Sequence, residues 1–244
     1  MDALKVRRTG GDEAPLEGSA MEALRQGLRG RLITAQDADY EHVRRTWNGM
    51  IDKRPALIAQ CSGTADVIAA VNFARTHQVP LTVRGGGHNV AGKALNDGGL
   101  VIDLSAMRGV RVDPAREVAV AGGGATLGDL DHETAPFSLA APVGVVSATG
   151  LGGLTLHGGY GWLSRRFGLS IDNLTAVDIV TADGQLHHAS SEEEPELFWA
   201  VRGGGGEFGV VTAFEFRLSP VGQEVWFGMT MYPMERGAEA LRLF

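Results

Sequence analysis

The sequence predicts an α+β protein built from two α/β lobes that share one ligand. Three observations support this fold: a strand–helix–strand pattern in the first half of the chain, two hairpin patterns and a long alternating strand in the second half, and glycines gathered in clusters. The chain has 244 residues, 44% of them hydrophobic, which is enough for one large core or two small ones.

A strand–helix–strand unit is predicted from the pattern over residues 55–84. Residues 55–60 form an apolar run typical of a buried strand, and apolar side chains recur at helical spacing after Thr64, a candidate helix cap. Residues 80–84 again have the pattern of a strand, which completes a βαβ unit. Ligands of such units gather at the carboxyl ends of the strands, so residues 85–88 are predicted to bind a ligand.

Antiparallel strands are predicted in the second half of the chain from alternating residues and turn residues. Two pairs of strand-like segments flank turns at Asp113-Pro114 and Asp183-Gly184, which is the pattern of antiparallel hairpins. Phe214 and Phe216 fall on one face of a later, half-buried strand. The predicted strands are 100–103, 110–112, 118–120, 177–181, 185–188 and 211–218, and a helix is predicted over 195–201.

Both ends of the chain are expected to lie outside the main folded unit, which spans residues 31–220. Residues 1–30 are polar and are expected to form a disordered extension. Residues 36–48 are expected to form a polar helix. After residue 220 the pattern changes, and residues 221–244 are expected to open a second domain that is truncated. The segments expected there are a strand over 225–232 and an amphipathic helix over 235–244.

Charge and composition exclude several partners. The formal net charge is -7, which argues against nucleic acid and against an anionic membrane. Cys61 is the single cysteine, so an intrachain disulfide cannot form. The sequence has neither a run of about 18 apolar residues nor the pattern of a signal peptide, and a cytoplasmic location is expected. The oligomeric state stays open.

Glycine is the compositional outlier. The sequence has 35 glycines, about twice the roughly 7% share of an average protein. They gather beside strand-like or helix-like segments, where glycine lets a backbone turn sharply or lets a ligand approach the main chain. The chain is therefore expected to wrap one long, phosphate-bearing ligand. The clusters are residues 85–87, 122–124, 150–161 and 203–206.

Two nucleotide-binding patterns are only partly matched. Residues 87–94 nearly spell the P-loop pattern after a strand, but Ala94 replaces the hydroxyl residue that would bind magnesium. Asp103 also follows Lys93 too closely to leave room for the helix of a P-loop. Glycines in the cluster 122–128 have the spacing G-x-G-x-x-x-G, which departs from the dinucleotide fingerprint and equally fits a tight turn from strand to helix.

A third pattern, Arg84-Gly-Gly-Gly-His88-Asn89, places three glycines directly after a strand. Successive backbone N–H groups of such a turn can form a nest for an anion. A neutral imidazole has a free nitrogen that can act as a nucleophile, so His88 is a candidate for chemistry beside the nest. Taken alone, a histidine beside glycines is usually a hydrogen-bonding loop residue.

Four linked motifs, at residues 83–105, 121–131, 142–174 and 196–216, together resemble one family. They are VRGGGHNVAGKALNDGGLVIDLS, AGGGATLGDLD, PVGVVSATGLGGLTLHGGYGWLSRRFGLSIDNL and ELFWAVRGGGGEFGVVTAFEF. Their order and spacing resemble the berberine-bridge-enzyme-like oxidases of the vanillyl-alcohol-oxidase (PCMH-type) FAD-binding family. The layout is most similar to bacterial members of the 6-hydroxynicotine oxidase kind.

The resemblance implies that residues 31–220 are a PCMH-type domain with FAD between its two lobes, and that residues 221–244 begin a substrate domain. It implies a bond from His88 to the 8-methyl group of the flavin, with the pyrophosphate on the glycine nest. It names no catalytic acid or base and no metal ligand in this chain. The residues that it places at the cofactor are Arg84, Gly85, Gly86, Gly87, His88, Asn89, Gly92, Gly124, Pro142, Gly144, Thr149, Gly150, Gly153, Gly159, Gly161 and Val211.

The sequence departs from the family at informative positions. Val146 stands where many relatives have a second, cysteinyl anchor, so a single attachment is implied. Leu154 replaces a histidine of the plant-type members, and His157 replaces the first glycine of a common triple. Thr149 falls where the family's side chain controls access of oxygen to the flavin, and its small size implies that O2 is the electron acceptor.

The function expected from this resemblance is oxidation of a small organic substrate by hydride transfer to a histidyl-linked flavin that O2 reoxidises. The substrate itself is left open, because the resemblance places the residues that select it beyond this chain. Two alternatives from other classes stay in view. One is a flavin carrier or inactive fragment, and the other is a P-loop nucleotide triphosphatase.

Overall fold

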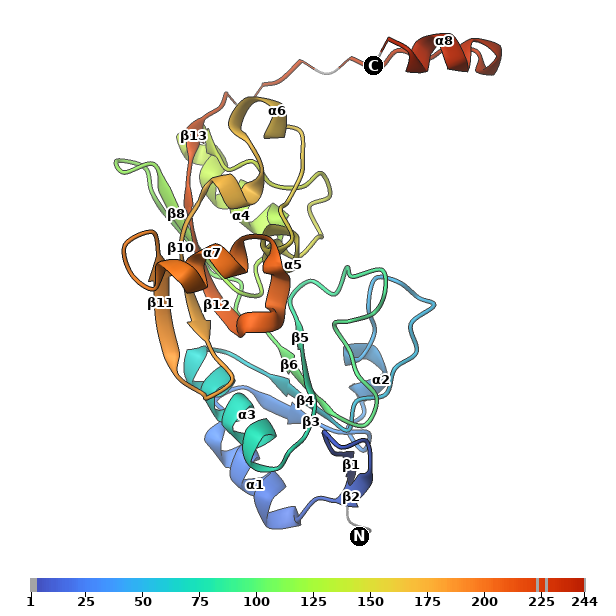
Figure 1. Ribbon diagram of the computed structural model, residues 1–244, viewed down its shortest axis with the longest axis vertical. Helices are drawn as coiled ribbons and strands as arrows, with labels where there is room; N and C mark the ends of the chain where they lie inside the picture. The colour runs from blue at the N-terminus through green and yellow to red at the C-terminus, as the bar shows by residue number, and fades with distance from the viewer. Residues whose placement is uncertain (1–3, 223, 227, 244) are drawn as a thin grey trace.

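Two β-sheets, one in each lobe, organise the chain (Figure 1). The computed structural model describes residues 4–222, 224–226 and 228–243. The first lobe lies at the bottom of Figure 1 and the second in the middle, with the end of the chain running away at the top. The predicted α+β fold of two lobes is confirmed.

The first lobe is built on a four-stranded mixed sheet with the strand order β3-β4-β6-β5. β6 lies between β4 and β5 and is parallel to both, whereas β3 is antiparallel to β4. The predicted βαβ unit is present, with α3 as its crossover and β6 inserted between its strands. The bounds are β3 (Arg31–Ile33), β4 (Leu57–Gln60), α3 (Thr64–Thr76), β5 (Leu81–Arg84) and β6 (Leu100–Asp103).

The sheet of the first lobe is covered on both faces, which explains its continuous apolar strands. Alternate residues of β4 belong to different clusters: Leu57 and Ala59 pack with α3, and Ile58 packs with Tyr40 on the opposite side. The second face is covered by the chain around α2 (Tyr40–Val43). The predicted helix over 36–48 is therefore wrong in length, because only one turn forms before the chain crosses the loop that follows β5.

The second lobe is a five-stranded antiparallel sheet with the order β11-β10-β12-β8-β7. Both predicted hairpins are confirmed, as β7–β8 and β10–β11. Phe214 and Phe216 of β12 are buried, as their alternation predicts. The bounds are β7 (Val110–Asp113), β8 (Val118–Gly122), β10 (Leu174–Val180), β11 (Leu186–Ser190) and β12 (Val210–Arg217).

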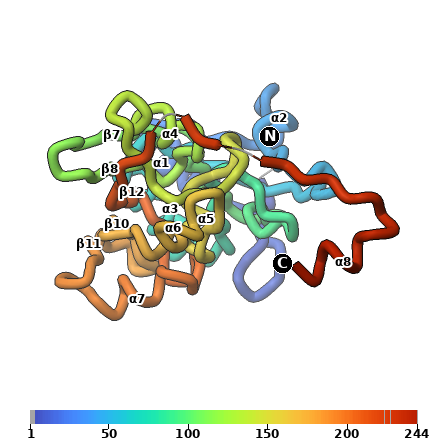
Figure 2. Tube along the Cα trace, turned by 90° about the horizontal axis from the view of Figure 1, so that it is seen from above, coloured from blue at the N-terminus to red at the C-terminus, as the bar shows by residue number. Residues whose placement is uncertain are grey.

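Helices and short turns cover the second sheet and connect its strands (Figures 1 and 2). Helix α4 has a capping box in which the Thr126 hydroxyl and the Asp129 carboxylate each bond the other's backbone N–H. The elements are α4 (Leu127–Thr134), η1 (Ala135–Phe137), β9 (Leu139–Ala140), α5 (Leu151–Leu156), α6 (Ser164–Phe167), η2 (Ser170–Asp172), α7 (Pro195–Gly204), η3 (Gly205–Phe208) and β13 (Ser219–Pro220), the last paired with β9.

The lobes are joined by an apolar seam. Val180 at the end of β10 and Val210 at the start of β12 belong to the same buried cluster as Val67 and Val71 of α3. One helix therefore serves both lobes and fixes their relative position.

The prediction that residues 1–30 are disordered is wrong for the described residues 4–30. They form a hairpin of β1 (Lys5–Arg7) and β2 (Glu13–Pro15), followed by α1 (Gly18–Gly27). The segment has few apolar side chains, but Val6, Leu16 and Leu24 are all buried in the core of the first lobe. The backbone N–H of Arg7 also donates to the carbonyl of Gly98. Contacts distant in sequence thus order a segment whose composition is polar.

The end of the chain also differs from expectation. No strand is present in the described residues of the segment 225–232, and Trp226 is fully exposed. The expected helix is reduced to η4 (Met234–Arg236) and α8 (Gly237–Leu241), which lie away from the body in Figures 1 and 2. An isolated strand has no partner for its backbone groups, so the pattern alone does not form one. Residues 223, 227 and 244 lie outside the described residues. No helix in the described ranges is long and apolar enough to cross a membrane.

The Asp66 carboxylate ties the first residues of the chain to the core. It is 3% exposed and accepts hydrogen bonds from the backbone N–H groups of Arg29, Gly30 and Ser62, at 2.8–3.0 Å. Burial alone would raise the pKa of Asp66, but these hydrogen bonds outweigh it and hold the pKa below the usual range.

Asp66→Ala is expected to lower the free energy of unfolding by about 2–4 kcal/mol, because three partly buried backbone donors lose a charged acceptor. Asp12→Ala, which removes an exposed carboxylate from the β1–β2 turn, is the control and should change it little. Because folding lowers the pKa of Asp66, its stabilisation is present at neutral pH and is lost as the pH falls. The difference between parent and variant in urea unfolding should therefore shrink below about pH 4. Equal stability of both variants at pH 7 would contradict this role.

Candidate functional site

The loop directly after β5 presents a run of unpaired backbone donors. In the described part of the chain, none of the N–H groups of Gly85, Gly86, Gly87 and His88 donates to a protein acceptor. Gly87 is buried and has a φ of +69°, in the region that favours glycine. Gly85 and His88 are half-buried and Gly86 is exposed. Four successive N–H groups without a protein acceptor form a concave set of donors of the kind that binds an anionic ligand. We refer to residues 85–88 as the nest.

The nest lies directly against the third glycine cluster. A Cβ atom on Gly86 would lie 2.3 Å from the backbone nitrogen of Gly150, and one on Gly150 would lie 2.2 Å from that of Gly86. Only two glycines allow the chains to cross at this distance. The crossing brings Thr149 and the first turn of α5 beside the nest.

The other two glycine clusters, residues 122–124 and 203–206, lie near the two ends of α5. Gly123 lies beside both Gly85 and Gly152, since a Cβ on either of these would lie 3.3–3.4 Å from its carbonyl oxygen. At the far end of α5, a Cβ on Gly205 would lie 2.7 Å from Nε2 of His157. The four glycine clusters predicted to surround one ligand are therefore brought together along the junction of the lobes.

Several residues predicted to touch the cofactor also have close packing contacts within the protein. The N–H of Gly124 donates to the carbonyl of Met107, and a Cβ there would lie 1.7 Å from the carbonyl oxygen of Leu104. The Gly122 cluster is thus a tight turn between strand and helix, the alternative that its spacing left open. Gly144, Gly159 and Gly161 similarly face Leu154, Ser170 and Val143, Val211 is buried in β12, and the carbonyl of Pro142 accepts a bond from Ser170.

Arg84 supports the nest from below. Its guanidinium group donates from Nε and Nη2 to the carboxylate of Asp103, at 3.1 and 2.5 Å. The two residues are register partners at the ends of β5 and β6, and both are buried. Nη1 donates to the backbone carbonyls of Val43 and Arg45. Because each of its three nitrogens has a protein partner, Arg84 holds the start of the loop in place.

His88, half-buried at the end of the nest, stacks on Trp47. The ring centroids are 5.5 Å apart and the planes differ by 19°. The backbone N–H of Trp47 also donates to the backbone carbonyl of Gly87. This bond holds the two residues together, so that the indole lies beside the imidazole. Asn89 closes the next turn, since its carbonyl and side chain accept from the N–H groups of Gly92 and Lys93.

The P-loop alternative conflicts with the structure. Lys93 is exposed, Ala94 is buried, and within the described residues 91–99 no helix follows the loop. The ammonium group that bonds this loop is that of Lys53, which donates to the carbonyls of Gly92 and Leu95 at 2.9 and 3.0 Å. A P-loop needs a lysine directed at the phosphates and a helix directly after the loop. In the part of the chain that the structure describes, this loop has an exposed Lys93 and no helix directly after it.

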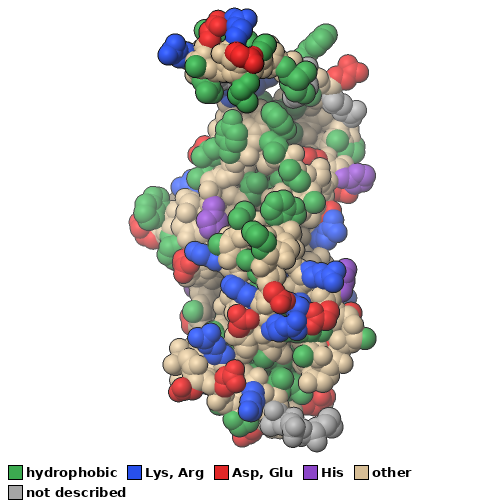
Figure 3. Space-filling view, turned by 90° about the vertical axis from the view of Figure 1, so that its right-hand side faces the viewer, with side chains coloured by type: hydrophobic (Ala, Val, Ile, Leu, Met, Phe, Trp, Pro, Cys, Tyr) green, Lys and Arg blue, Asp and Glu red, His purple; other side chains and the backbone are tan. Residues whose placement is uncertain are grey.

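Open surface lies on α5, which begins at the crossing of Gly86 and Gly150, and exposed apolar side chains lie in the segments before and after this helix. Gly153 is exposed on α5, and a Cβ there would meet no atom within 4 Å. Val145 and Val146 are about half exposed, and Tyr160 and Trp162 are exposed more fully. Figure 3 shows apolar side chains gathered over the second lobe, whereas charged side chains gather over the first. A flat aromatic ligand bound at α5 would cover apolar surface of this kind.

Cys61 is excluded as a reactive group. It is fully buried, and burial together with the Asp66 and Asp103 carboxylates raises the pKa of its thiol to about 12. The prediction that it is a small core residue is confirmed. In the described residues, no group of three or more His, Cys, Asp or Glu side chains could hold a metal ion.

The fold and the nest together define a two-lobed domain that can bind an anionic, phosphate-bearing ligand. The family described as "FAD binding domain" matches residues 55–190. The chain belongs to this family, and the predicted resemblance to PCMH-type FAD oxidases is confirmed.

Relatives with assigned names give the same picture. (R)-6-hydroxynicotine oxidase of Paenarthrobacter nicotinovorans is 43% identical over 191 residues, covering 78% of this chain and 42% of the relative. The crystal structure of 6-hydroxy-D-nicotine oxidase from Arthrobacter nicotinovorans aligns with a TM-score of 0.78 at 42% identity, covering 79% of this chain and 43% of that one. Xylooligosaccharide oxidase from Myceliophthora thermophila C1 aligns with a TM-score of 0.77 at 32% identity, covering 83% and 43%. The chain thus spans less than half the length of these relatives.

Proposed function

We propose that this chain is the cofactor-binding part of an FAD-dependent oxidase, with the diphosphate of FAD on the nest and the flavin bonded to His88. The observation that carries the proposal is the run of four unpaired N–H groups that ends at His88. A diphosphate accepts hydrogen bonds from such donors without a lysine. The open surface over Gly153 fits the flavin ring, and the crossing at Gly86 brings that surface next to the nest.

We infer a single covalent bond from the side chains that are present. A nitrogen of His88 would form a C–N bond to the 8-methyl carbon of the flavin. This new bond would replace one C–H bond of the methyl group and the N–H bond of the imidazole. The two hydrogens and their electrons leave as hydrogen peroxide, with O2 as the oxidant. Val146 cannot form a thioether, and the buried Cys61 lies in another element, so no second bond is proposed.

The bound flavin would accept a hydride from a small organic substrate and pass the electrons to O2. The protein residues bind and orient it: the nest holds the phosphates and α5 supports the ring. The half-buried Thr149, beside Gly150 at the crossing, leaves a small side chain on the proposed route of oxygen. Names of the relatives include oxidases of a hydroxynicotine and of xylooligosaccharides, which supports a small heterocyclic amine or a sugar as substrate class.

The proposal is tested on the protein expressed at the full length that its gene encodes. We expect a yellow protein with flavin absorption bands, O2 uptake with amine, alcohol or sugar substrates, and formation of hydrogen peroxide. Lys93→Ala should change neither the absorption nor the turnover, because its side chain is exposed and outside the nest. A colourless protein that hydrolyses ATP would replace this function with that of a nucleotide triphosphatase. A yellow protein without turnover on any of these substrates would favour a flavin carrier.

A further inference from the structure

We propose that Trp47 is a positioning residue for His88, and that its indole holds the imidazole in the plane from which the flavin is attached. This inference rests on the proposed function, because it concerns the bond at His88. The observation that carries it is the stacking of the two rings, with centroids 5.5 Å apart and planes that differ by 19°.

The exposure of Trp47 separates this role from an ordinary packing role. Trp47 is 66% exposed, whereas the aromatic residues of the first-lobe core, Tyr40 and Phe73, are buried. An indole that belongs to no buried cluster contributes little to the stability of the core. Its aromatic partner is His88, the residue to which the chemistry at the nest is assigned.

Trp47 is carried by a segment, residues 43–53, that runs along the loop 84–95 and is bonded to it repeatedly. We refer to this segment as the strap. The backbone bond from Trp47 to Gly87 fixes the strap next to His88, and other bonds fix it on both sides. These bonds run from Nη1 of Arg84 to Val43 O and Arg45 O, from Nδ2 of Asn48 to Val90 O, and from Nζ of Lys53 to Gly92 O and Leu95 O.

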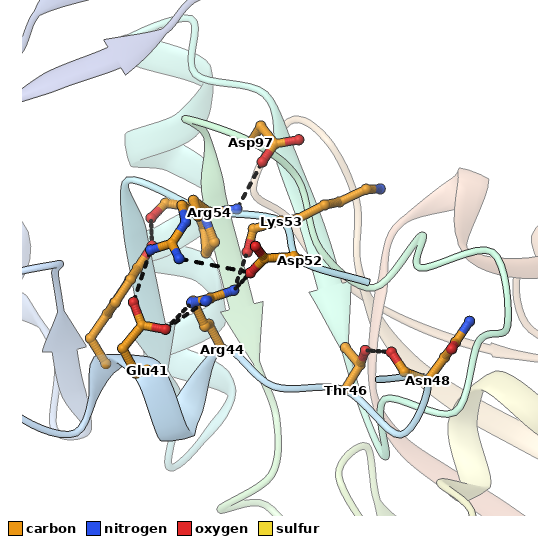
Figure 4. Close-up of polar contacts among 10 residues, drawn as sticks. Glu41, Arg44, Thr46, Asn48, Asp52, Lys53, Arg54 and Asp97 are labelled. Atoms are coloured by element: carbon orange, nitrogen blue, oxygen red, sulfur yellow. Dashed lines mark hydrogen bonds and ion pairs between the residues drawn. The ribbon is translucent and has the colours of Figure 1, made fainter. Parts of the chain in front are cut away.

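An ion-pair network anchors the two ends of the strap to each other (Figure 4). Arg44, whose side chain is 9% exposed, bonds Glu41 at 2.5 Å and Asp52 at 2.6 Å. Arg54 bonds the other oxygen of Glu41 at 2.8 Å. Figure 4 shows Thr46 and Asn48 away from this network, at the part of the strap that reaches the loop. The indole therefore belongs to a segment whose ends are held by ion pairs.

A fixed imidazole plane matters because the attachment step needs one ring nitrogen directed at one carbon. The terminal torsion of a histidine is broad, so an unsupported ring spends much of its time in other orientations. The rate of an intramolecular step scales with the fraction of the population in the reactive geometry. A stacked aromatic neighbour narrows this distribution, and losing it should slow attachment by about 3- to 10-fold.

The test measures attachment and reversible binding separately. Apoprotein of the parent, Trp47→Ala, Trp47→Phe and the control Trp199→Ala, which removes an exposed tryptophan of α7, is mixed with FAD. The rate at which flavin becomes resistant to acid precipitation of the protein is recorded. The affinity for FAD is measured for His88→Ala with and without Trp47→Ala, since attachment cannot occur there.

We expect slower attachment in Trp47→Ala, a rate within about 2-fold of the parent in Trp47→Phe, because the ring is retained, and no change in Trp199→Ala. Reversible affinity should be the same with and without Trp47→Ala. A parental rate in Trp47→Ala would overturn this inference and leave the proposed function standing. The inference would also be overturned if Trp47→Ala, added to His88→Ala, lowered the reversible affinity for FAD by the same factor as it lowered the attachment rate. Trp47 would then bind the cofactor or support the loop. Absence of covalent flavin in the parent would overturn the proposed function and the inference with it.

Discussion

Gly153→Leu is expected to weaken FAD binding by roughly 10- to 100-fold, because a side chain forced into the contact between protein and flavin costs about 1–3 kcal/mol. The protein itself should stay folded. A Cβ at Gly153 would meet no protein atom within 4 Å, and leucine is a better helix former than glycine, so α5 should tolerate the change. The new side chain would occupy the surface on which the flavin ring is proposed to lie. Binding is measured by titration of FAD in the His88→Ala background, where it is reversible.

The matched control is Gly27→Leu. Gly27 is also an exposed helical glycine with no atom near its Cβ position, but it lies at the end of α1 in the first lobe. It should bind FAD with the affinity of the parent, and both variants should unfold at or above the parental temperature. If Gly153→Leu bound FAD as tightly as Gly27→Leu, the flavin would not lie on α5. Gly86 is less suited to this purpose, because a side chain there would force it away from Gly150 and disturb the fold itself.

Much of the fold is predictable from the sequence because its signals are local. The strands β4, β5 and β6 are short apolar runs, and the β7–β8 and β10–β11 hairpins have turn residues between alternating strands. The segments whose structure was mispredicted are ordered by contacts with residues distant in sequence. Residues 5–27 look disordered by composition and fold because Val6, Leu16 and Leu24 reach the core of the first lobe.

The candidate site is predictable in part for the same reason. The nest is a local feature, a glycine triplet after a strand, and it could be identified from the sequence. The role of Gly124 depends on Leu104 and Met107, which approach it only in the folded chain. Glycines that admit another protein segment and glycines that admit a ligand have the same sequence signal.

Trp47, Lys53 and Asp103 were missed as parts of the site. The partner of Trp47 is 41 positions away, and no periodicity or spacing connects the two rings. Asp103 gave a usable signal, since it ends a buried strand as Arg84 does, and parallel strands that end together bring such side chains side by side. A buried acid and a buried base at the ends of neighbouring strands could have been expected to pair.

His88→Ala is expected to abolish covalent attachment of the flavin completely. The imidazole nitrogen is the nucleophile of the proposed bond, and alanine has no atom that could replace it. Reversible binding should remain, because the four N–H groups of the nest belong to the backbone and the surface at α5 is unchanged. Acid denaturation should therefore release all flavin from the variant and none from the parent. Cys61→Ala is the control and should behave like the parent, since that thiol is buried.

The bond at His88 is the central claim, and peptide mapping of the holoprotein by mass spectrometry tests it most directly. The protein is denatured in acid, digested, and each peptide is examined for the added mass of FAD. We predict one adduct, on the peptide that contains residues 85–92, with fragment ions that assign it to His88. An adduct on the Cys61 peptide or on another histidine, or a purified yellow protein whose peptides all lack FAD, would contradict the account.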